Sequence, residues 1–201
     1  MDLADFQSLA DENDGYRFCL LGVDVLSRRV FAVPIKSKST KDMFEGFEEL
    51  FKQMPHLPSE IYSDRGLEFE SGEMKRYFQD KGIEKFSARS SYVKAAVAER
   101  FIRSLKLRLY RWISEKNSLK WTKVLPEIVN AMNNTVNSAT GMTPNEVNPE
   151  NASILWDKLY RQYLYPETKK KATKFKPSDA VRLVKKKQTF EKGYLANYSG
   201  S

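Results

Sequence analysis

The sequence has few residues that could form a disulfide or a zinc site. Its 201 residues include one cysteine, Cys19, and one histidine, His56. A disulfide within the chain needs two cysteines, and a histidine-cysteine zinc module needs about four ligands, so neither can form. Catalysis by Ser-His-Asp or Cys-His groups would depend on His56, whose proline-flanked segment (MPHLP) predicts a surface loop. We expect Cys19 in the core, and chemistry that rests on carboxylates and a metal ion.

Long apolar segments are also absent. The sequence has no run of about 18 apolar residues, so no membrane span or membrane partner is expected. The opening residues lack a charged stretch followed by an apolar one, so no secretion signal is expected either. Hydrophobic residues make up 41% and aromatic residues 12%, which excludes global disorder and allows a packed core. The length suits one domain, or one domain with a fragment of another.

The formal net charge of +8 is unevenly distributed. Residues 1–84 carry a net charge of −6, residues 85–123 of +9, residues 124–155 of −3 and residues 156–201 of +8. This pattern favours carboxylates that hold cations in the first part and basic surfaces that bind a polyanion elsewhere. A solvated basic face with no partner is the alternative that charge alone leaves open.

Apolar periodicity predicts an α/β domain that begins with a β-hairpin and adds parallel strands. Pro126 predicts a kink or a broken start in the last long helix. Strands are expected at residues 1–9, 16–27, 29–35, 60–63 and 83–87, and helices at about 39–53, 71–81, 94–116 and 119–137.

Three acidic residues occupy positions where they could bind divalent ions. Asp2 falls in the first predicted strand, Asp64 directly follows a short strand, and Glu99 lies in the first turns of a long helix. Carboxylates on three such elements could hold two hard ions, which would promote attack on a phosphodiester. Each has a simpler reading: a frayed terminus for Asp2, a turn residue for Asp64, and a helix ion pair with Arg103 for Glu99.

Several motifs resemble the retroviral integrase superfamily. Residues 63–69 (SDRGLEF) look like the signature around the second catalytic aspartate, and residues 97–106 (VAERFIRSLK) look like the helix with the catalytic glutamate. Thirty-four residues separate Asp64 from Glu99, close to the spacing usual in that family. Asp2 with the following hairpin resembles the first-aspartate strand, and residues 133–144 resemble the segment that closes the core.

The resemblance implies an RNase H-like fold with a mixed five-stranded sheet flanked by helices and a C-terminal basic extension. It implies Asp2, Asp64 and Glu99 as catalytic residues and as ligands of a two-metal site for Mg²⁺ or Mn²⁺. The implied activity is DNA integration by a polynucleotidyl transferase, through 3′-end processing (an endonuclease step) and strand transfer. Two alternatives remain: a domesticated integrase-like protein that binds DNA or chromatin without catalysis, and an RNase H-type nuclease.

The C-terminal part narrows the resemblance. Residues 175–182 (FKPSDAVR) look like the opening of an SH3- or chromo-like barrel, and residues 189–195 (TFEKGYL) resemble the tail of Polinton/Maverick DNA transposon integrases. We therefore expect a catalytic core over residues 1–150, a helical and basic linker over 151–173, and the start of a truncated C-terminal domain over 174–201. The upstream zinc-binding module of full integrases is also missing, so a fragment is expected.

The predicted partner is double-stranded DNA, both transposon ends and target DNA. Arg103 and Lys106 share a helix face with Glu99, so we expect both to contact DNA phosphates beside the site; a solvated basic face is the alternative. The predicted contacts in the loop that precedes this helix are Arg89, Tyr92 and Lys94. Joining two DNA ends implies at least a homodimer, and the lysine-rich runs are weak signals for the nucleus.

Overall fold

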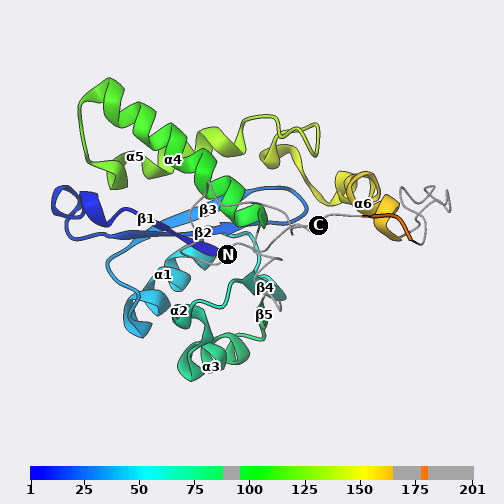
Figure 1. The fold of residues 1–201 in the computed structure, drawn as a ribbon, viewed down its shortest axis with the longest axis horizontal. Coiled ribbons are helices and arrows are strands. Elements are labelled where there is room, and N and C mark those ends of the chain that lie inside the picture. Colours follow the sequence, from blue (N-terminus) through cyan, green and yellow to red (C-terminus); the bar gives the residue numbers. More distant parts are fainter. Residues whose placement is uncertain (88–95, 165–177, 181–201) are drawn as a thin grey trace. The chain divides into compact units, whose positions relative to one another are not determined.

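The computed structural model describes residues 1–87, 96–164 and 178–180, and contacts divide the chain into units Met1–Arg161 and Gln162–Ser201. The first unit contains the strands and nearly all of the helices (Figure 1). In chain order the elements are β1 (Asp2–Asp5), β2 (Phe18–Val23), β3 (Val30–Ile35), α1 (Thr40–Lys52), β4 (Glu60–Ser63), α2 (Leu67–Glu70), α3 (Gly72–Asp80), β5 (Glu84–Ser87), α4 (Ala96–Lys116), α5 (Trp121–Asn133) and α6 (Pro149–Leu164), with 3-10 turns at Gln7–Leu9, Asp11–Asn13 and Pro144–Glu146.

The first three strands form an antiparallel sheet in the order β1-β2-β3. Asp2 pairs with Leu21 across β1 and β2, and Leu20 pairs with Val33 across β2 and β3. The predicted β-hairpin is confirmed. Asp24 stabilises its turn, because the Asp24 carboxylate accepts a hydrogen bond of 2.6 Å from the Ser27 backbone nitrogen.

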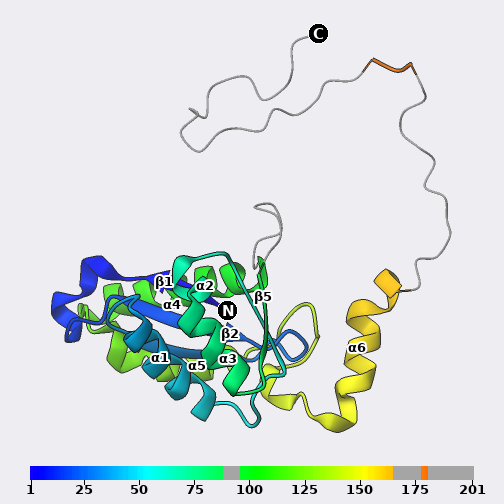
Figure 2. The ribbon, with the colours of Figure 1, turned by 90° about the horizontal axis from the view of Figure 1, so that it is seen from below.

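Both faces of this sheet are buried, which explains the nearly continuous apolar sequence of β2 and β3. Side chains alternate between the faces. Figures 1 and 2 show α4 and α5 on one face and α1 on the other. Cys19 and Leu21 pack toward Leu105 and Trp121, whereas Leu20 packs toward Phe47. Cys19 is fully buried, and burial raises the pKa of its thiol to about 12, so the prediction of a core cysteine is confirmed.

The strands β4 and β5 form a parallel pair, with Ile61 opposite Lys85. The prediction of one five-stranded sheet is not confirmed, because the described strands form a three-stranded and a two-stranded sheet. The Met1 amino group nevertheless donates a hydrogen bond of 2.6 Å to the Tyr62 carbonyl oxygen, which brings the start of β1 beside β4. A continuous ladder would need successive bonds of this kind along both strands.

The helices lie close to their predicted ranges, with differences at their ends. The Ser39 side chain caps α1 by accepting a hydrogen bond from the Asp42 backbone nitrogen. Pro126 lies inside α5, which continues through it from Trp121 to Asn133, so the helix start is not broken there and the alternative, a kink, stays a prediction. The short helix α2 was not predicted. Among the described helices, none has the length and apolar character that a membrane span requires.

Two buried asparagines connect segments that are distant in the sequence. Asn133, at the end of α5, accepts a hydrogen bond from the Val30 backbone nitrogen and donates one to the Val30 carbonyl oxygen, both at 2.8 Å. Asn13 donates to the Leu119 carbonyl oxygen at 2.9 Å and accepts from the Thr122 backbone nitrogen at 3.1 Å. These bonds hold α5 to β3 and to the turn after β1, and so stabilise the layer that carries the candidate site.

Candidate active site

Asp2 is positioned by the first strand. It is half-buried, and its Oδ1 accepts a hydrogen bond of 2.7 Å from the Leu3 backbone nitrogen. Ala4, two residues later, is buried in the cluster that includes Leu105 of α4. Because alternate residues of a strand share a face, Asp2 lies on the side of the sheet that α4 covers.

Asp64 directly follows β4, whose last residue, Ser63, is buried. Its Oδ1 accepts a hydrogen bond of 3.1 Å from the Gly66 backbone nitrogen, which shapes the turn into α2. Since the Met1 amino group bonds to Tyr62, two residues earlier, the β4 end lies beside the start of β1. The carboxylates of Asp2 and Asp64 therefore come from neighbouring strand ends.

Glu99 lies in the first turn of α4. It is exposed, whereas the neighbouring Ala98 is buried. Asp2 and Glu99 line the same cleft between β1 and α4, which has a volume of about 460 Å³. The cleft also has basic and apolar walls, and its other lining residues are Leu3, Ala4, Asp5, Ile102, Arg103, Lys106, Leu107 and Tyr110.

The electrostatics of Asp2 link the three acidic residues. Burial raises the pKa of the Asp2 carboxyl, and the negative charges of Asp64 and Glu99 raise it further. The hydrogen bond from the Leu3 backbone and the nearby Met1 amino group act in the opposite direction. The sequence placed these acids on three separate elements, and the fold brings Asp64 and Glu99 close enough to Asp2 to raise the pKa of its carboxyl.

Carboxylate oxygens suit Mg²⁺ and Mn²⁺, and the repulsion felt by Asp2 is of the kind that a bound cation relieves. In the part of the chain that the structure describes, no three acidic, histidine or cysteine side chains already form a complete metal-binding cluster. The donor set of Asp2, Asp64 and Glu99 therefore fits a divalent ion in its chemistry, and ligation by all three would require their side chains to adjust.

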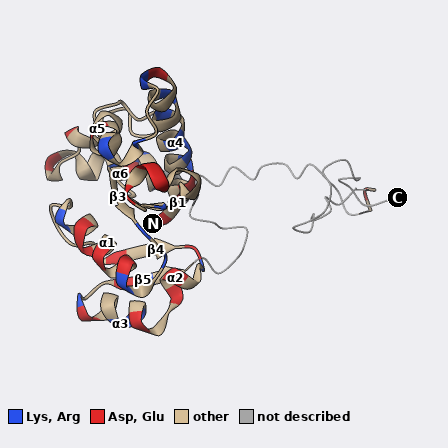
Figure 3. Cartoon of the chain, turned by 90° about the vertical axis from the view of Figure 1, so that its left-hand side faces the viewer, with Lys and Arg blue, Asp and Glu red and all other residues tan. Residues whose placement is uncertain are grey.

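The predicted DNA-binding residues fall into two groups. Arg103 and Lys106 line the cleft beside Glu99, and Figure 3 shows basic residues along α4. The Lys106 Nζ lies 5.3 Å from the centre of the Phe6 ring, and its charge contributes to a lowered pKa of the Asp5 carboxyl. The predicted contacts of the preceding loop, Arg89, Tyr92 and Lys94, lie outside the described residues, as does most of the predicted C-terminal domain.

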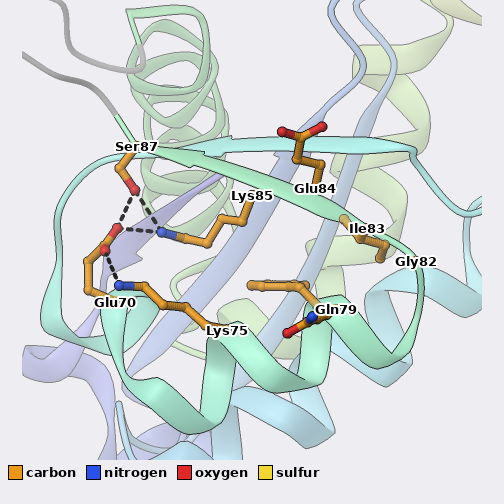
Figure 4. Close-up of a pocket in the computed structure, with 9 residues that line it drawn as sticks. Glu70, Lys75, Gln79, Gly82, Ile83, Glu84, Lys85 and Ser87 are labelled. Atoms are coloured by element: carbon orange, nitrogen blue, oxygen red, sulfur yellow. Dashed lines mark hydrogen bonds and ion pairs between the residues drawn. The ribbon is translucent and has the colours of Figure 1, made fainter.

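A second cluster of charged residues ties α2 to the end of β5 (Figure 4). The Lys85 side chain is 6% exposed, and its Nζ lies 2.5 Å from Glu70 Oε1 and 2.8 Å from Ser87 Oγ. Lys75 Nζ lies 3.1 Å from the other Glu70 oxygen, Oε2. The hydrogen bond from Lys85 is the largest cause that lowers the pKa of Glu70 to about 2. This cluster borders a separate pocket of about 590 Å³ and fixes β5 just before residue 88.

Known proteins resemble the chain in both sequence and structure. An uncharacterised transposon-derived protein of Caenorhabditis elegans is 34% identical over 183 residues, which is 91% of this chain and 60% of that protein. Among solved structures, a chain of the simian T-cell lymphotropic virus intasome, in complex with the PP2A regulatory subunit B56 gamma, gives a TM-score of 0.61 at 19% identity, over 67% of this chain and 49% of that chain.

The HTLV-2 integrase catalytic core domain, solved in complex with magnesium, gives a TM-score of 0.56 at 18% identity. The match covers 65% of this chain and 83% of that domain. The chain has the fold of a retroviral integrase catalytic core. This finding confirms the resemblance and the RNase H-like fold class. A scan against models of protein families finds no match.

The integrase fold accounts for where the site lies, but sequence reasoning missed two features beside it. The Lys38 ammonium forms an ion pair of 2.7 Å with Glu68 Oε1, close to Asp64. The Glu70 cluster lies two residues further along α2. The acidic residues of α2 are readable in the sequence, but Lys85, the buried partner of Glu70, is 15 residues away along the chain, and Lys38, the partner of Glu68, is 30 residues away. No local spacing pattern connects residues at such separations.

Proposed function

We propose that this integrase-type core catalyses divalent-metal-dependent DNA integration through Asp2, Asp64 and Glu99. The observation that carries the proposal is the placement of three carboxylates on β1, after β4 and on α4. Asp2 and Glu99 line one cleft, and the start of β1 is hydrogen-bonded beside the end of β4, which Asp64 follows. The fold similarity to integrase catalytic cores supports it, as does the transposon-derived relative. The chain spans 60% of that relative, so the activity of the whole protein is part of the proposal.

Two reaction steps follow from the proposal. Water first attacks a phosphodiester near a DNA end and releases a 3′-OH, which then attacks a phosphodiester of the target DNA. When bound by the three carboxylates, Mg²⁺ or Mn²⁺ would supply Lewis acidity for both steps. Arg103 and Lys106 would bind DNA phosphates from the α4 side of the cleft and hold the strand against the acids. No covalent bond between protein and DNA is required.

The proposed partners are DNA and further copies of the chain. Related cores have been solved in dimeric and trimeric forms, and one related chain belongs to an intasome. We therefore propose that the chain acts as a homodimer or a higher oligomer on transposon ends and target DNA, and that it acts in the nucleus. A Polinton-type element as the source is part of the same proposal.

A substrate comparison tests the function. Incubated with Mn²⁺, the chain is expected to join a labelled duplex end to a plasmid and to cleave an RNA–DNA hybrid weakly or not at all. Because Lys106 lines the cleft and would bind a DNA phosphate, Lys106→Ala is expected to weaken DNA binding and to reduce its salt dependence by about one phosphate contact. Efficient hybrid cleavage without joining would favour an RNase H-type nuclease, and DNA binding without either reaction would favour a domesticated protein.

A further inference from the structure

The ion pair of Lys38 and Glu68 lies on the side of the candidate site opposite α4. Lys38 precedes α1, and Glu68 lies in α2, four residues after Asp64. The Lys38 Nζ lies 2.7 Å from Glu68 Oε1 and 5.3 Å from the centre of the Phe18 ring. Phe18 pairs with Asp5 at the end of β1, and the charge of Lys38 contributes to the lowered pKa of the Asp5 carboxyl. Asp5 borders the cleft that Asp2 and Glu99 line.

Glu68 connects this lysine to the Asp64 turn. A side-chain Cβ at Gly66 would lie 2.7 Å from Glu68 Oε2 and 3.1 Å from Asp64 Oδ1, so both carboxylates flank the same side of Gly66. The other oxygen of Glu68, Oε1, accepts a hydrogen bond from the Lys38 ammonium. The Glu68 side chain thus lies between the Lys38 ammonium and the Asp64 turn. The ammonium lies on the side of the cleft that Asp5 borders.

The two partners differ in exposure. The Lys38 side chain is 47% exposed, whereas that of Glu68 is 12% exposed. A solvent-exposed ammonium on a flexible stem can move to a new acceptor, and exposed ion pairs are weak enough for another anion to compete. The Glu68 carboxylate, by contrast, is largely shielded from solvent and lies beside Gly66.

We propose that Lys38 is a DNA-phosphate contact on the α2 side of the site, and that Glu68 holds it in reach until DNA replaces the carboxylate as its partner. The inference rests on the proposed function, because it takes DNA as the substrate. A DNA strand carries a phosphate about every 3.4 Å along the helix axis, so a strand that passes the acids meets cations on both sides. Arg103 and Lys106 contact phosphates from α4, and Lys38 contacts one from the opposite wall.

Binding of a labelled duplex, measured by fluorescence anisotropy at several salt concentrations and constant MgCl₂, tests the proposal with the full chain. Lys38→Ala is expected to weaken binding about three- to tenfold and to lower the slope of log K against log salt by about 0.9. Lys38→Arg should retain binding. The matched control is Lys52→Ala, which removes another ion-paired lysine, 2.5 Å from Glu49, at the opposite end of α1. That control should leave both quantities unchanged.

If DNA replaces Glu68 as the partner of Lys38, removal of the Glu68 charge should strengthen DNA binding. Glu68→Gln frees Lys38 and is expected to tighten binding about two- to threefold, whereas Glu49→Gln should not. In the Lys38→Ala background, Glu68→Gln should give no gain. A gain in DNA affinity that persists without Lys38 would show that Glu68 acts only through its charge. That result would overturn the proposed exchange of Glu68 for a DNA phosphate.

The proposed phosphate contact of Lys38 and the proposed DNA integration can be refuted separately. Equal affinity and salt slope for Lys38→Ala and Lys52→Ala would overturn the phosphate contact even if the chain joins DNA. Strand transfer that survives loss of Asp64 would overturn the proposed function, whatever Lys38 does. Circular dichroism with thermal unfolding should show the same fold in all variants, because both lysines are exposed.

Discussion

Asp64→Asn is expected to abolish strand transfer, with a loss of at least about a thousandfold in rate. The substitution keeps the size of the side chain, and an asparagine oxygen can still accept the hydrogen bond from the Gly66 backbone nitrogen. It removes the negative charge that a divalent ion requires at this position. Each loss of about 1.4 kcal/mol in transition-state stabilisation lowers the rate tenfold, and a metal ion contributes several kcal/mol.

Glu99→Gln is expected to have the same effect, because Glu99 lines the cleft with Asp2. Joining of a labelled duplex to plasmid DNA in Mn²⁺ measures both variants. Asp80→Asn, at the exposed end of α3, is the control and should retain full activity. Unchanged thermal unfolding would show that the variants lose activity because the reaction fails and not because they unfold. Activity near that of the wild type in either variant would refute the assignment of these acids.

The largest expected effect on stability comes from Phe47. Its side chain is completely buried in the middle of α1, and its ring centre lies 4.9 Å from Phe78, 5.6 Å from Phe51 and 6.3 Å from Phe69. Phe47→Ala removes contacts to α1, α2 and α3 at once and leaves a cavity among rigid aromatic rings. The expected loss in the free energy of unfolding is about 3–5 kcal/mol.

Urea unfolding followed by circular dichroism measures this loss. Leu57→Ala is the control, because Leu57 is 52% exposed in the loop before β4, and its change should stay within about 0.5 kcal/mol. A loss below about 1 kcal/mol for Phe47→Ala would mean that the aromatic cluster can repack. Because Phe69 belongs to α2, which follows Asp64, Phe47 also supports the turn that carries the candidate metal ligand.

The sequence was most informative where a pattern repeats over many residues. The apolar hairpin of β2 and β3 and the long helix α4 were predicted because strands and helices impose periods of two and 3.6 on buried side chains. The exposed loop position of His56 and the buried position of Cys19 follow from their neighbours in the chain and are confirmed. The candidate acids were first singled out by their positions on predicted strands and a predicted helix, and the motif resemblance to integrases then supported them.

The features that sequence reasoning missed depend on contacts between distant residues. Helix α2 has four residues, too few to show a helical period. Asn13 looks like an ordinary turn residue and Asn133 like a helix residue, yet each bonds to a backbone group more than 100 positions away. Lys38 and Glu68 meet only because the fold brings the segment before α1 to α2. Such pairs follow from the three-dimensional fold, which local propensity does not encode.

The central claim is that Asp2, Asp64 and Glu99 form one metal site. Anomalous diffraction from crystals of the chain soaked in manganese chloride tests it most directly. We expect an anomalous peak bound by these three carboxylates, and no such peak in crystals of Asp64→Asn. Manganese that binds elsewhere, or a peak that survives the loss of Asp64, would show that the three acids do not form one metal site.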